Sequence, residues 1–387
     1  MQNLLEAFQP GNWEWRNGVM IVVGLVLILL AITKEYEPML LLPIGFGCIL
    51  VNLPLAAVLS VTTTAADGTQ VVQEGFLQVL YKAGIVTELF PLLIFVGIGA
   101  MIDFSPLLKQ PVMIFFGAAA QFGIFAAFLL AICANWIFPD IFSIKEAAAV
   151  GIIGAADGPT TIYVGNLFAK DYIAPLSVAA YSYMSLVPII QPPVIRAMTT
   201  KKERLIRMDA DFSAKVSKPV LIALPIVITI IVGFVAPAGV PLVGALMFGN
   251  LIRECGVLER LSQAAQKELT NIVTLLLGIT IGASMVGKEF LQWHTLLILI
   301  IGFLAFVFDT AGGVLFAKFV NLFLKKKVNP MIGAAGISAF PMSARIVQKM
   351  AQKEDPSNFI LMQAIGANVS GQIGSIIAGA VLISLLS

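Results

Sequence analysis

Long apolar runs dominate this chain. Residues 19–32 and 111–133 are near-continuously apolar, and about 20 such residues are enough for a helix to cross a bilayer. Only 12% of the residues are charged while 59% are hydrophobic, whereas a soluble domain carries roughly a quarter charged residues. A membrane β-barrel would alternate apolar and polar residues instead. The pattern therefore predicts an all-α, polytopic membrane protein.

Ten apolar segments are candidates for spanning helices: 18–33, 39–56, 88–103, 112–136, 172–195, 219–236, 240–252, 271–286, 295–322 and 359–386. Two further apolar segments, 147–168 and 329–345, are interrupted by Gly and Pro. Proline removes a backbone donor, and the residue before it resists helical geometry. We therefore expect each of these two segments to be a re-entrant, broken-helix hairpin that returns to the side from which it started.

Lysine and arginine predict the orientation, because they gather in cytoplasmic loops. The largest basic cluster lies in the loop 196–218, which we expect to be cytoplasmic. Counting spans outward from this loop places the N-terminus and the polar loop 62–75 outside. The hairpin 147–168 then enters from outside and the hairpin 329–345 enters from the cytoplasm. The two hairpins are predicted to point at each other.

An internal repeat supports this arrangement. Three matches occur in the same order, at offsets of 183, 179 and 187 residues: IGAMIDFS with IGASMVGK, IGAADGP with IGAAGIS, and YIAPLSVAAYSY with FILMQAIGANVS. With the predicted topology the two copies are inverted, an architecture typical of ion-coupled transporters. The predicted organisation is N-terminal membrane helices with an external loop (1–87), a first inverted repeat (88–195), a basic cytoplasmic loop (196–218), connecting helices (219–270) and a second inverted repeat (271–387).

Asp157 is the sharpest candidate for chemistry. It lies in the hairpin 147–168, directly before Gly158 and Pro159, and an ionisable residue within a bilayer is a functional hypothesis by default. Its carboxylate, unwound backbone carbonyls and the hydroxyls of Thr160 and Thr161 are hard oxygen ligands, which Na⁺ prefers. The alternative is that Asp157 caps a half-helix through a backbone amide. Both roles are compatible.

The second hairpin carries Asn329, Ser338 and Arg345. We expect Ser338 and the loop carbonyls to face the same midplane as Asp157. Arg345 follows the break closely, so we expect a buried side chain that could bind a carboxylate bidentately beside a helix N-terminus. The alternative is that Arg345 extends to the cytoplasmic headgroups.

Polar stripes follow both hairpins at corresponding places of the two repeats. The first contains Tyr181, Ser182, Tyr183 and Ser185, and the second contains Asn368, Ser370, Gln372 and Ser375. Such residues also join membrane helices to one another, which explains part of the pattern. A second intramembrane acid, Asp309, lies near Lys318 in sequence. An ion pair between them and an ion site at Asp309 are equally open.

Other function classes lack their signals. The sequence contains no P-loop, no GxGxxG phosphate cradle and no histidine-based triad, since the chain has 1 His, so we do not expect ATP-driven pumping. The 3 cysteines are far apart and form no metal spacing or disulfide framework. A net charge of +2 gives no nucleic-acid signal.

Several long motifs make the chain resemble the β subunits of the biotin-dependent sodium-translocating decarboxylases, which act on oxaloacetate, methylmalonyl-CoA, glutaconyl-CoA or malonate. They are GIIGAADGPTTIYVGNLFA, YSYMSLVPIIQPPVIRAMTTKKERLIRM, FDTAGGVLFAKFVNLF, NPMIGAAGISAFPMSARIVQK and ANVSGQIGSIIAGAV. The resemblance runs from about residue 34 to the C-terminus. It implies an inner-membrane subunit of a bacterial or archaeal cell. It also implies a carboxyltransferase α subunit, a biotin carrier protein and a small single-span γ or δ subunit as partners.

The resemblance also implies roles for individual residues. The family's essential aspartate and tyrosine correspond to Asp157 and Tyr183, and its NPxIG…S…R set and late asparagine correspond to Asn329, Gly333, Ser338, Arg345 and Asn368. Of these, Gly333 is assigned to close helix contact. The implied reaction is the decarboxylation of carboxybiotin held by a partner subunit, which consumes a proton and drives Na⁺ outward.

On these grounds we expect Asp157, Tyr183 and Arg345 to be catalytic, and Arg345, Asn329 and Ser338 to contact carboxybiotin. The expected Na⁺ ligands are Asp157, Asn368, Tyr183, Asn329, Ser338 and Ser370. We also expect the chain to form a homo-oligomer surrounded by lipid. Two alternatives stay open: a Na⁺-coupled secondary carboxylate transporter on the same scaffold, and a non-catalytic membrane anchor for a soluble complex.

Overall fold

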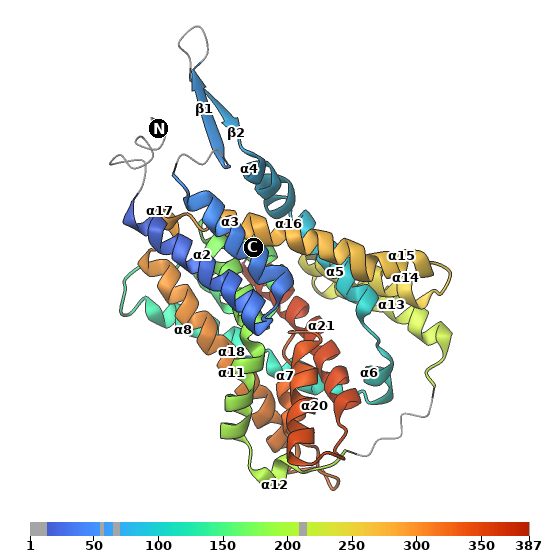
Figure 1. Ribbon diagram of the computed structural model, residues 1–387. Helices are drawn as coiled ribbons and strands as arrows, with labels where there is room; N and C mark the ends of the chain where they lie inside the picture. The colour runs from blue at the N-terminus through green and yellow to red at the C-terminus, as the bar shows by residue number, and fades with distance from the viewer. Residues whose placement is uncertain (1–13, 55–57, 65–69, 209–214, 387) are drawn as a thin grey trace.

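The computed structural model describes residues 14–54, 58–64, 70–208 and 215–386, and this part of the chain is almost entirely helical (Figure 1). The exception is an antiparallel hairpin of β1 (Ser60–Thr64) and β2 (Gln70–Glu74), in which Ser60 pairs with Glu74. These strands depart from the all-α prediction. The extreme N-terminus and part of the predicted outer loop 62–75 lie outside the described residues.

Six helical segments of the described chain are long and apolar enough to cross a membrane, and a bent pair (Phe76–Val86 with Leu89–Met101, 60°) would add a seventh. They are α2 (Trp15–Lys34), α7 with α8 (Met113–Ala120, Phe122–Ala134), α11 with its leading turn (Lys170–Met198), α13 (Lys218–Val235), α18 (Trp293–Val320) and α21 (Leu361–Leu386). The helices α3 (Pro38–Asn52), α5 (Leu89–Met101), α14 (Val240–Glu254) and α16 (Thr270–Ala283) are shorter. This architecture is that of a polytopic membrane protein.

Both segments expected to be broken helices are interrupted. The first consists of α9 (Ile144–Gly151), a 3₁₀ turn and α10 (Gly158–Phe168), with Ala156 at a φ of 55° in the break. The second consists of α19 (Met331–Ala334) and α20 (Met342–Glu354). Residues 147–166 and 328–339 are buried throughout. Irregular backbone at membrane depth is tolerated only where protein covers it.

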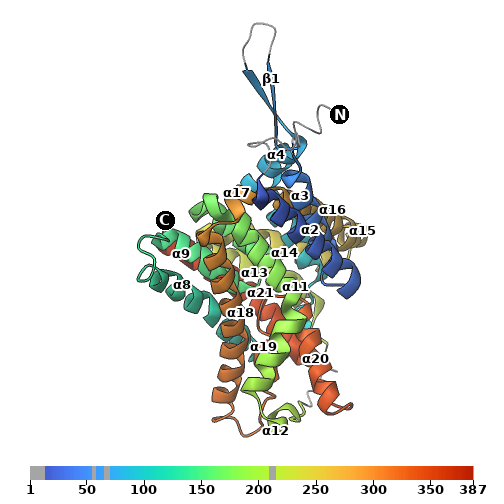
Figure 2. The same cartoon turned by 60° about the vertical axis from the view of Figure 1, so that its left-hand side comes forward.

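The two breaks meet inside the protein. Ala156 of the first break and Ile337 and Ala339 of the second belong to one buried apolar cluster, together with Ala120 and Phe306. Figure 2 shows α2, α3 and α16 on one side and α8, α9 and α18 on the other, with α11 and α21 between them. The interrupted segments therefore lie within the protein interior, away from lipid.

Helix pairs recur in a regular way. The helices α2 and α3 contact each other, as do α13 and α14; α3 packs on α16 while α14 packs on α5; and α11 packs on α18 while α21 packs on α7. Small residues allow the close crossings. A Cβ atom on Gly99 would meet the carbonyl oxygen of Leu246, and one on Gly282 would meet that of Ile44.

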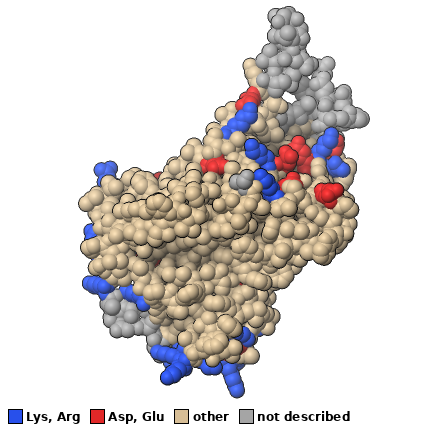
Figure 3. Space-filling model, turned by 180° about the vertical axis from the view of Figure 1, so that it is seen from behind, with Lys and Arg blue, Asp and Glu red and all other residues tan. Residues whose placement is uncertain are grey.

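On the face seen from behind, charged side chains gather towards the two ends of the molecule. Seen from behind, Lys and Arg follow the left and lower edges, side chains of both signs gather at the upper right, and a broad uncharged surface separates the two regions (Figure 3). At the basic end, Arg204 pairs with Glu354 at 2.8 Å, and Arg207 pairs with Asp355 at 2.6 Å. An uncharged band between polar ends is the surface expected of a chain embedded in a bilayer.

Candidate functional site

Asp157 lies at the first break with its side chain 2% exposed. Its Oδ2 atom accepts a hydrogen bond from the Thr160 hydroxyl at 2.5 Å, from Nε2 of Gln372 at 3.1 Å and from the Ser375 hydroxyl at 3.4 Å. Asp157 occupies the N-cap position of α10, but its side chain makes no capping hydrogen bond. The carboxylate therefore lies between Thr160 of α10 and two side chains of α21.

The local sequence explains why the chain opens at this point. Pro159 occupies the first turn of α10, where its fixed φ is favourable and its missing N–H is not needed. The Thr161 hydroxyl donates to the Asp157 carbonyl oxygen at 2.9 Å. A Cβ atom on Gly158 would overlap the Tyr181 ring, so glycine lets α11 lie directly against the break.

The second break is attached to the same helix. The Ser338 hydroxyl donates to the carbonyl oxygen of Gly371 at 2.7 Å, and Nδ2 of Asn368 donates to the carbonyl oxygen of Ile337 at 2.6 Å. The Oδ1 atom of Asn368 is buried and has no hydrogen-bond partner among the described residues. Within about one turn, α21 thus holds the second break through Asn368 and the first through Gln372.

Two further amides bridge these elements, and the sequence interpretation missed both. Nε2 of Gln191, on α11, donates to the Ala334 carbonyl oxygen at 2.7 Å. Nε2 of Gln121, between α7 and α8, lies 2.9 Å from the Gly117 carbonyl oxygen and 3.3 Å from that of Gly371. A lone amide in an apolar run was the available signal, because a buried amide needs a partner. Gln121 also divides the predicted continuous span 112–136 into two helices.

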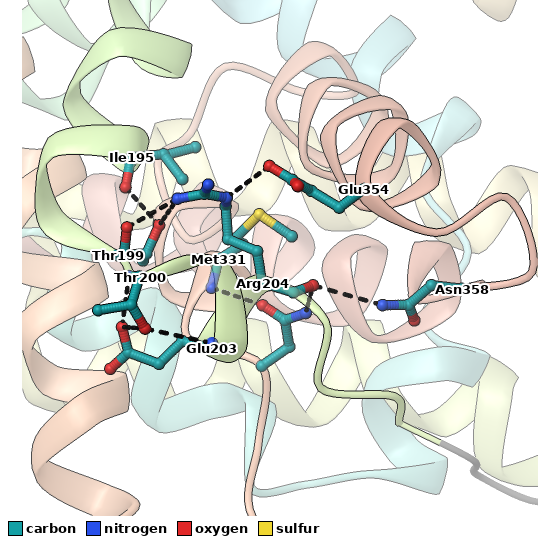
Figure 4. Close-up of polar contacts among 9 residues, drawn as sticks. Ile195, Thr199, Thr200, Glu203, Arg204, Met331, Glu354 and Asn358 are labelled. Carbon is teal, nitrogen blue, oxygen red and sulfur yellow. Dashed lines mark hydrogen bonds and ion pairs between the residues drawn. The ribbon is translucent and has the colours of Figure 1, made fainter.

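Asn329 lies away from Asp157, at the basic end of the molecule. Its Nδ2 atom donates to the carbonyl oxygens of Arg204 and Ile206, both at 2.9 Å, and its Oδ1 atom accepts from the Met331 amide. Figure 4 shows the Arg204 guanidinium between Thr199 and Glu354, while the Arg204 carbonyl oxygen faces Asn358. Asn329 thus holds residues 204–206 of the basic loop against the start of the second interrupted segment.

Tyr183 and Ser370 also have other partners. The Tyr183 hydroxyl donates to the Leu299 carbonyl oxygen at 2.5 Å, and its ring packs against Phe306. The Ser370 hydroxyl donates to the Ile114 carbonyl oxygen at 2.9 Å, on the side of α21 that faces α7. Of the six residues expected to bind Na⁺, Asp157, Asn368 and Ser338 lie at the two breaks, while Tyr183, Asn329 and Ser370 contact neighbouring helices or the loop.

The expectation of a buried Arg345 is wrong, because its side chain is exposed on α20. The buried face of α20 is formed by residues such as Ser343, Ala344 and Val347, which leaves Arg345 on the opposite face. Its charge acts on Glu37, in the loop between α2 and α3: burial raises the pKa of Glu37, and Arg345 opposes that rise.

Of the two alternatives left open for Asp309, the ion pair with Lys318 does not form, since Nζ of Lys318 lies 3.0 Å from Glu203. Asp309 is 1% exposed, and neither carboxylate oxygen has a hydrogen-bond partner among the described residues. Gly333 has the contact role predicted for it, because a Cβ atom there would overlap the Gly313 carbonyl oxygen.

Comparison with known proteins places these residues in a family context. The family model described as Na⁺-transporting oxaloacetate decarboxylase beta subunit matches residues 16–386. A probable oxaloacetate decarboxylase beta chain of Vibrio cholerae is 44% identical over 430 aligned residues, covering 99% of both chains. The methylmalonyl-CoA decarboxylase subunit beta of Propionigenium modestum is 46% identical over 379 residues, covering 95% of this chain and 94% of that one. The resemblance carried by the motifs is confirmed.

Proposed function

Because this chain belongs to the family of β subunits of Na⁺-transporting decarboxylases, we propose that it decarboxylates carboxybiotin presented by a partner subunit and couples this reaction to Na⁺ export. The observation that carries the proposal is the position of Asp157, a buried carboxylate among side-chain oxygens at a helix break that meets a second break. A non-catalytic anchor has no need of this arrangement.

The Na⁺ site that we propose is centred on Asp157. The hydroxyl oxygens of Thr160 and Ser375 already lie within hydrogen-bond reach of its carboxylate. The Oδ1 atom of Asn368, which has no partner in the described part of the chain, supplies a further buried acceptor, and a rotated Gln372 amide would present its oxygen in place of its nitrogen. Hard oxygen donors with one negative charge suit a monovalent hard cation. Without Na⁺, the hydroxyls of Thr160 and Ser375 and the amide of Gln372 donate hydrogen bonds to the carboxylate.

The basic end of the molecule suits the negatively charged carboxybiotin of the partner subunit. A cavity of about 460 Å³ there is lined by Met113, Met208, Leu324, Arg207 and Lys327, among others, so apolar walls and cations lie together. Carboxybiotin supplies the carboxyl group, which is lost as CO₂ once the ring nitrogen is protonated. This chain's residues must bind the anion, exclude water and deliver the proton. Arg345, exposed at the second hairpin, remains our candidate for orienting the carboxylate, with Asn329 and Ser338 on the same hairpin and Tyr183 on the proton route.

The helix pairings support an inverted repeat that is larger than the two predicted copies. If α2 and α3 of the first copy are matched with α13 and α14 of the second, the contact of α3 with α16 has its counterpart in the contact of α14 with α5. In the same way, the contact of α7 with α21 has its counterpart in the contact of α18 with α11. We propose that the helices assigned to 1–87 and 219–270 belong to the repeats. The basic loop 196–218 would be cytoplasmic and the N-terminus outside, as the distribution of charges supports.

We further propose that the chain works in a complex with a carboxyltransferase subunit, a biotin carrier and a small single-span subunit. The test is ²²Na⁺ transport by the purified complex in lipid vesicles, with each acyl substrate and with avidin added. The proposal predicts substrate-driven transport that avidin abolishes, since avidin captures biotin. Transport that needs no biotin-bearing partner would instead support a secondary carboxylate transporter.

A further inference from the structure

A second cavity, of about 560 Å³, lies at the end of the molecule opposite the basic loop. Its walls come from the segments around α4 (Phe76–Tyr81), α17 (Gly287–Phe290) and the start of α11, and Figure 1 shows α4 and α17 far from α12 (Lys201–Arg204). Residues that line it include Tyr81, Asp171, Ala174, Thr280, Ser284 and Glu289. The carboxylates of Asp171 and Glu289 line this cavity, and Asp157 does not. Lys170 and His294 line it as well.

One face of α11 leads from this cavity towards the protein centre. Ala174 lines the cavity, and Ser177 and Tyr181 follow at the spacing that puts residues on one helix face. Ser177 is 1% exposed and Tyr181 is 2% exposed, and neither hydroxyl has a hydrogen-bond partner among the described residues. Buried hydroxyls are usually paired, so two unpaired ones in succession require an explanation.

The inner end of this face reaches Asp157. The Tyr181 ring lies against Gly158, the residue next to Asp157. At about 1.5 Å of rise per residue, Ala174 and Tyr181 are about 10 Å apart along the helix. Apolar neighbours, Val178 and Ile281, share a buried cluster with Tyr181. Between the cavity and the carboxylate there is thus a short stretch whose unpaired polar groups are the hydroxyls of Ser177 and Tyr181.

We propose that this cavity and these two hydroxyls form the outer access path along which Na⁺ leaves Asp157, with the Tyr181 ring as the barrier that is closed in this structure. The inference rests on the proposed Na⁺ site and adds a route and a gate to it. Hydroxyl oxygens are hard donors that can replace part of the hydration of Na⁺. The carboxylates of Asp171 and Glu289 attract the cation at the mouth.

The test is cysteine modification in the complete complex, reconstituted in vesicles. Cys48, Cys133 and Cys255 are first replaced by alanine. Single cysteines are then introduced by Ser284→Cys at the cavity wall and by Ser177→Cys on the path. Ile300→Cys is the matched control, because Ile300 is 56% exposed on α18 and does not line the cavity. A membrane-impermeant, cationic methanethiosulfonate is applied from each side in turn, and ²²Na⁺ transport is measured.

We expect Ser284→Cys to be modified only from the side opposite the basic loop. Modification should slow Na⁺ transport by about tenfold or more, since each added ~1.4 kcal/mol of barrier slows a step about tenfold. Adding Tyr181→Ala should speed modification of Ser177→Cys, and Ile300→Cys should stay unmodified. Modification of Ser284→Cys with unchanged transport, or from the basic side, would overturn the path. If Asp157→Asn keeps Na⁺-dependent decarboxylation while the labelling pattern holds, the proposed Na⁺ site fails and the access cavity stands.

Discussion

The amide of Gln372 donates a hydrogen bond to the carboxylate of Asp157 at 3.1 Å, and it joins residues 215 positions apart in the chain. The same helix, α21, holds the second break through Asn368. Any change in the charge or ligation of Asp157 therefore acts on a helix that also contacts the other hairpin. If Asp157 binds Na⁺ as proposed, this contact gives ion binding at the first break a physical route to the second interrupted segment, α19 and α20.

Replacing Gln372 by leucine should weaken Na⁺ binding. Leucine removes the amide oxygen that Gln372 would turn towards the ion, and a polar contact to a charged group contributes about 1.5–3 kcal/mol, so the Na⁺ concentration that half-saturates decarboxylation should rise by roughly 10- to 100-fold. Gln363→Leu is the matched control, because Gln363 is another buried amide of α21 but donates to the Met208 carbonyl oxygen. An equal rise in both variants would mean that the effect is general to the helix.

Gly333→Ala should destabilise the protein. A Cβ atom there would overlap the Gly313 carbonyl oxygen, and forced overpacking costs about 1–3 kcal/mol. Gly244→Ala provides the comparison, since a Cβ atom at Gly244 meets nothing within 4 Å and alanine favours a helix by about 0.5–1 kcal/mol. Thermal unfolding in detergent should show a lower Tm for the first variant and an unchanged or higher Tm for the second. Equal values would refute the close contact.

Asn329→Asp should release the basic segment, because a carboxylate cannot donate to the carbonyl oxygens of Arg204 and Ile206. Limited trypsin digestion should then cleave after Arg204 or Arg207 several-fold faster, since local opening exposes the backbone. Asn358→Asp should have a smaller effect, because Nδ2 of Asn358 lies 3.5 Å and 3.3 Å from the same two oxygens. Cleavage at the wild-type rate in Asn329→Asp would contradict the role assigned to this side chain.

The pair of Glu203 and Lys318 should make stability depend on pH. Burial opposes ionisation of Glu203, but the Thr200 amide and Lys318 outweigh it, so the pKa of Glu203 lies below its usual value. A lowered folded-state pKa stabilises the protein above the unfolded pKa, about 4.3, and this contribution is lost as pH falls through the folded value. Glu203→Gln should therefore lower Tm at pH 7, by the equivalent of about 0.5–1 kcal/mol, and the difference should shrink steadily as pH falls below about 4.3.

The Lys318→Met background separates the ion pair from helix capping. Glu203 also accepts from the Thr200 amide in a capping box, which Lys318→Met leaves in place. The additional loss on Glu203→Gln should be smaller in that background, as in a double-mutant cycle. A loss of equal size in both backgrounds would show that the ion pair contributes nothing.

The spanning helices were predictable, because apolar length is a local property. The segment 295–322 was long for one crossing, and it forms one helix, α18, over Trp293–Val320. The short strands β1 and β2 were not predicted, since they flank a polar loop whose pattern resembles any exposed connection. The break before Pro159 was predicted from proline geometry, which is equally local.

Partners across the chain were harder to predict. Helical periodicity indicates that Gln372 and Ser375 share a polar stripe. It does not show that this stripe faces Asp157 and not the segment 329–345 that precedes it in the chain. Arg345 followed a break in sequence, yet its direction depends on which face of α20 is buried. Asn329 and Asn368 are both asparagines in the family motifs, and the sequence does not distinguish them. Only the packing shows that Asn329 contacts the basic loop while Asn368 contacts the second break.

The central claim is that Asp157 is the carboxylate that binds Na⁺. The most direct measurement is equilibrium ²²Na⁺ binding to the purified complex carrying Asp157→Asn, beside Asp309→Asn, which removes the charge from the other buried acid of the membrane region. We predict that Asp157→Asn abolishes Na⁺ binding at its site together with Na⁺-dependent decarboxylation, while Asp309→Asn retains both. Wild-type Na⁺ binding in Asp157→Asn would contradict the account.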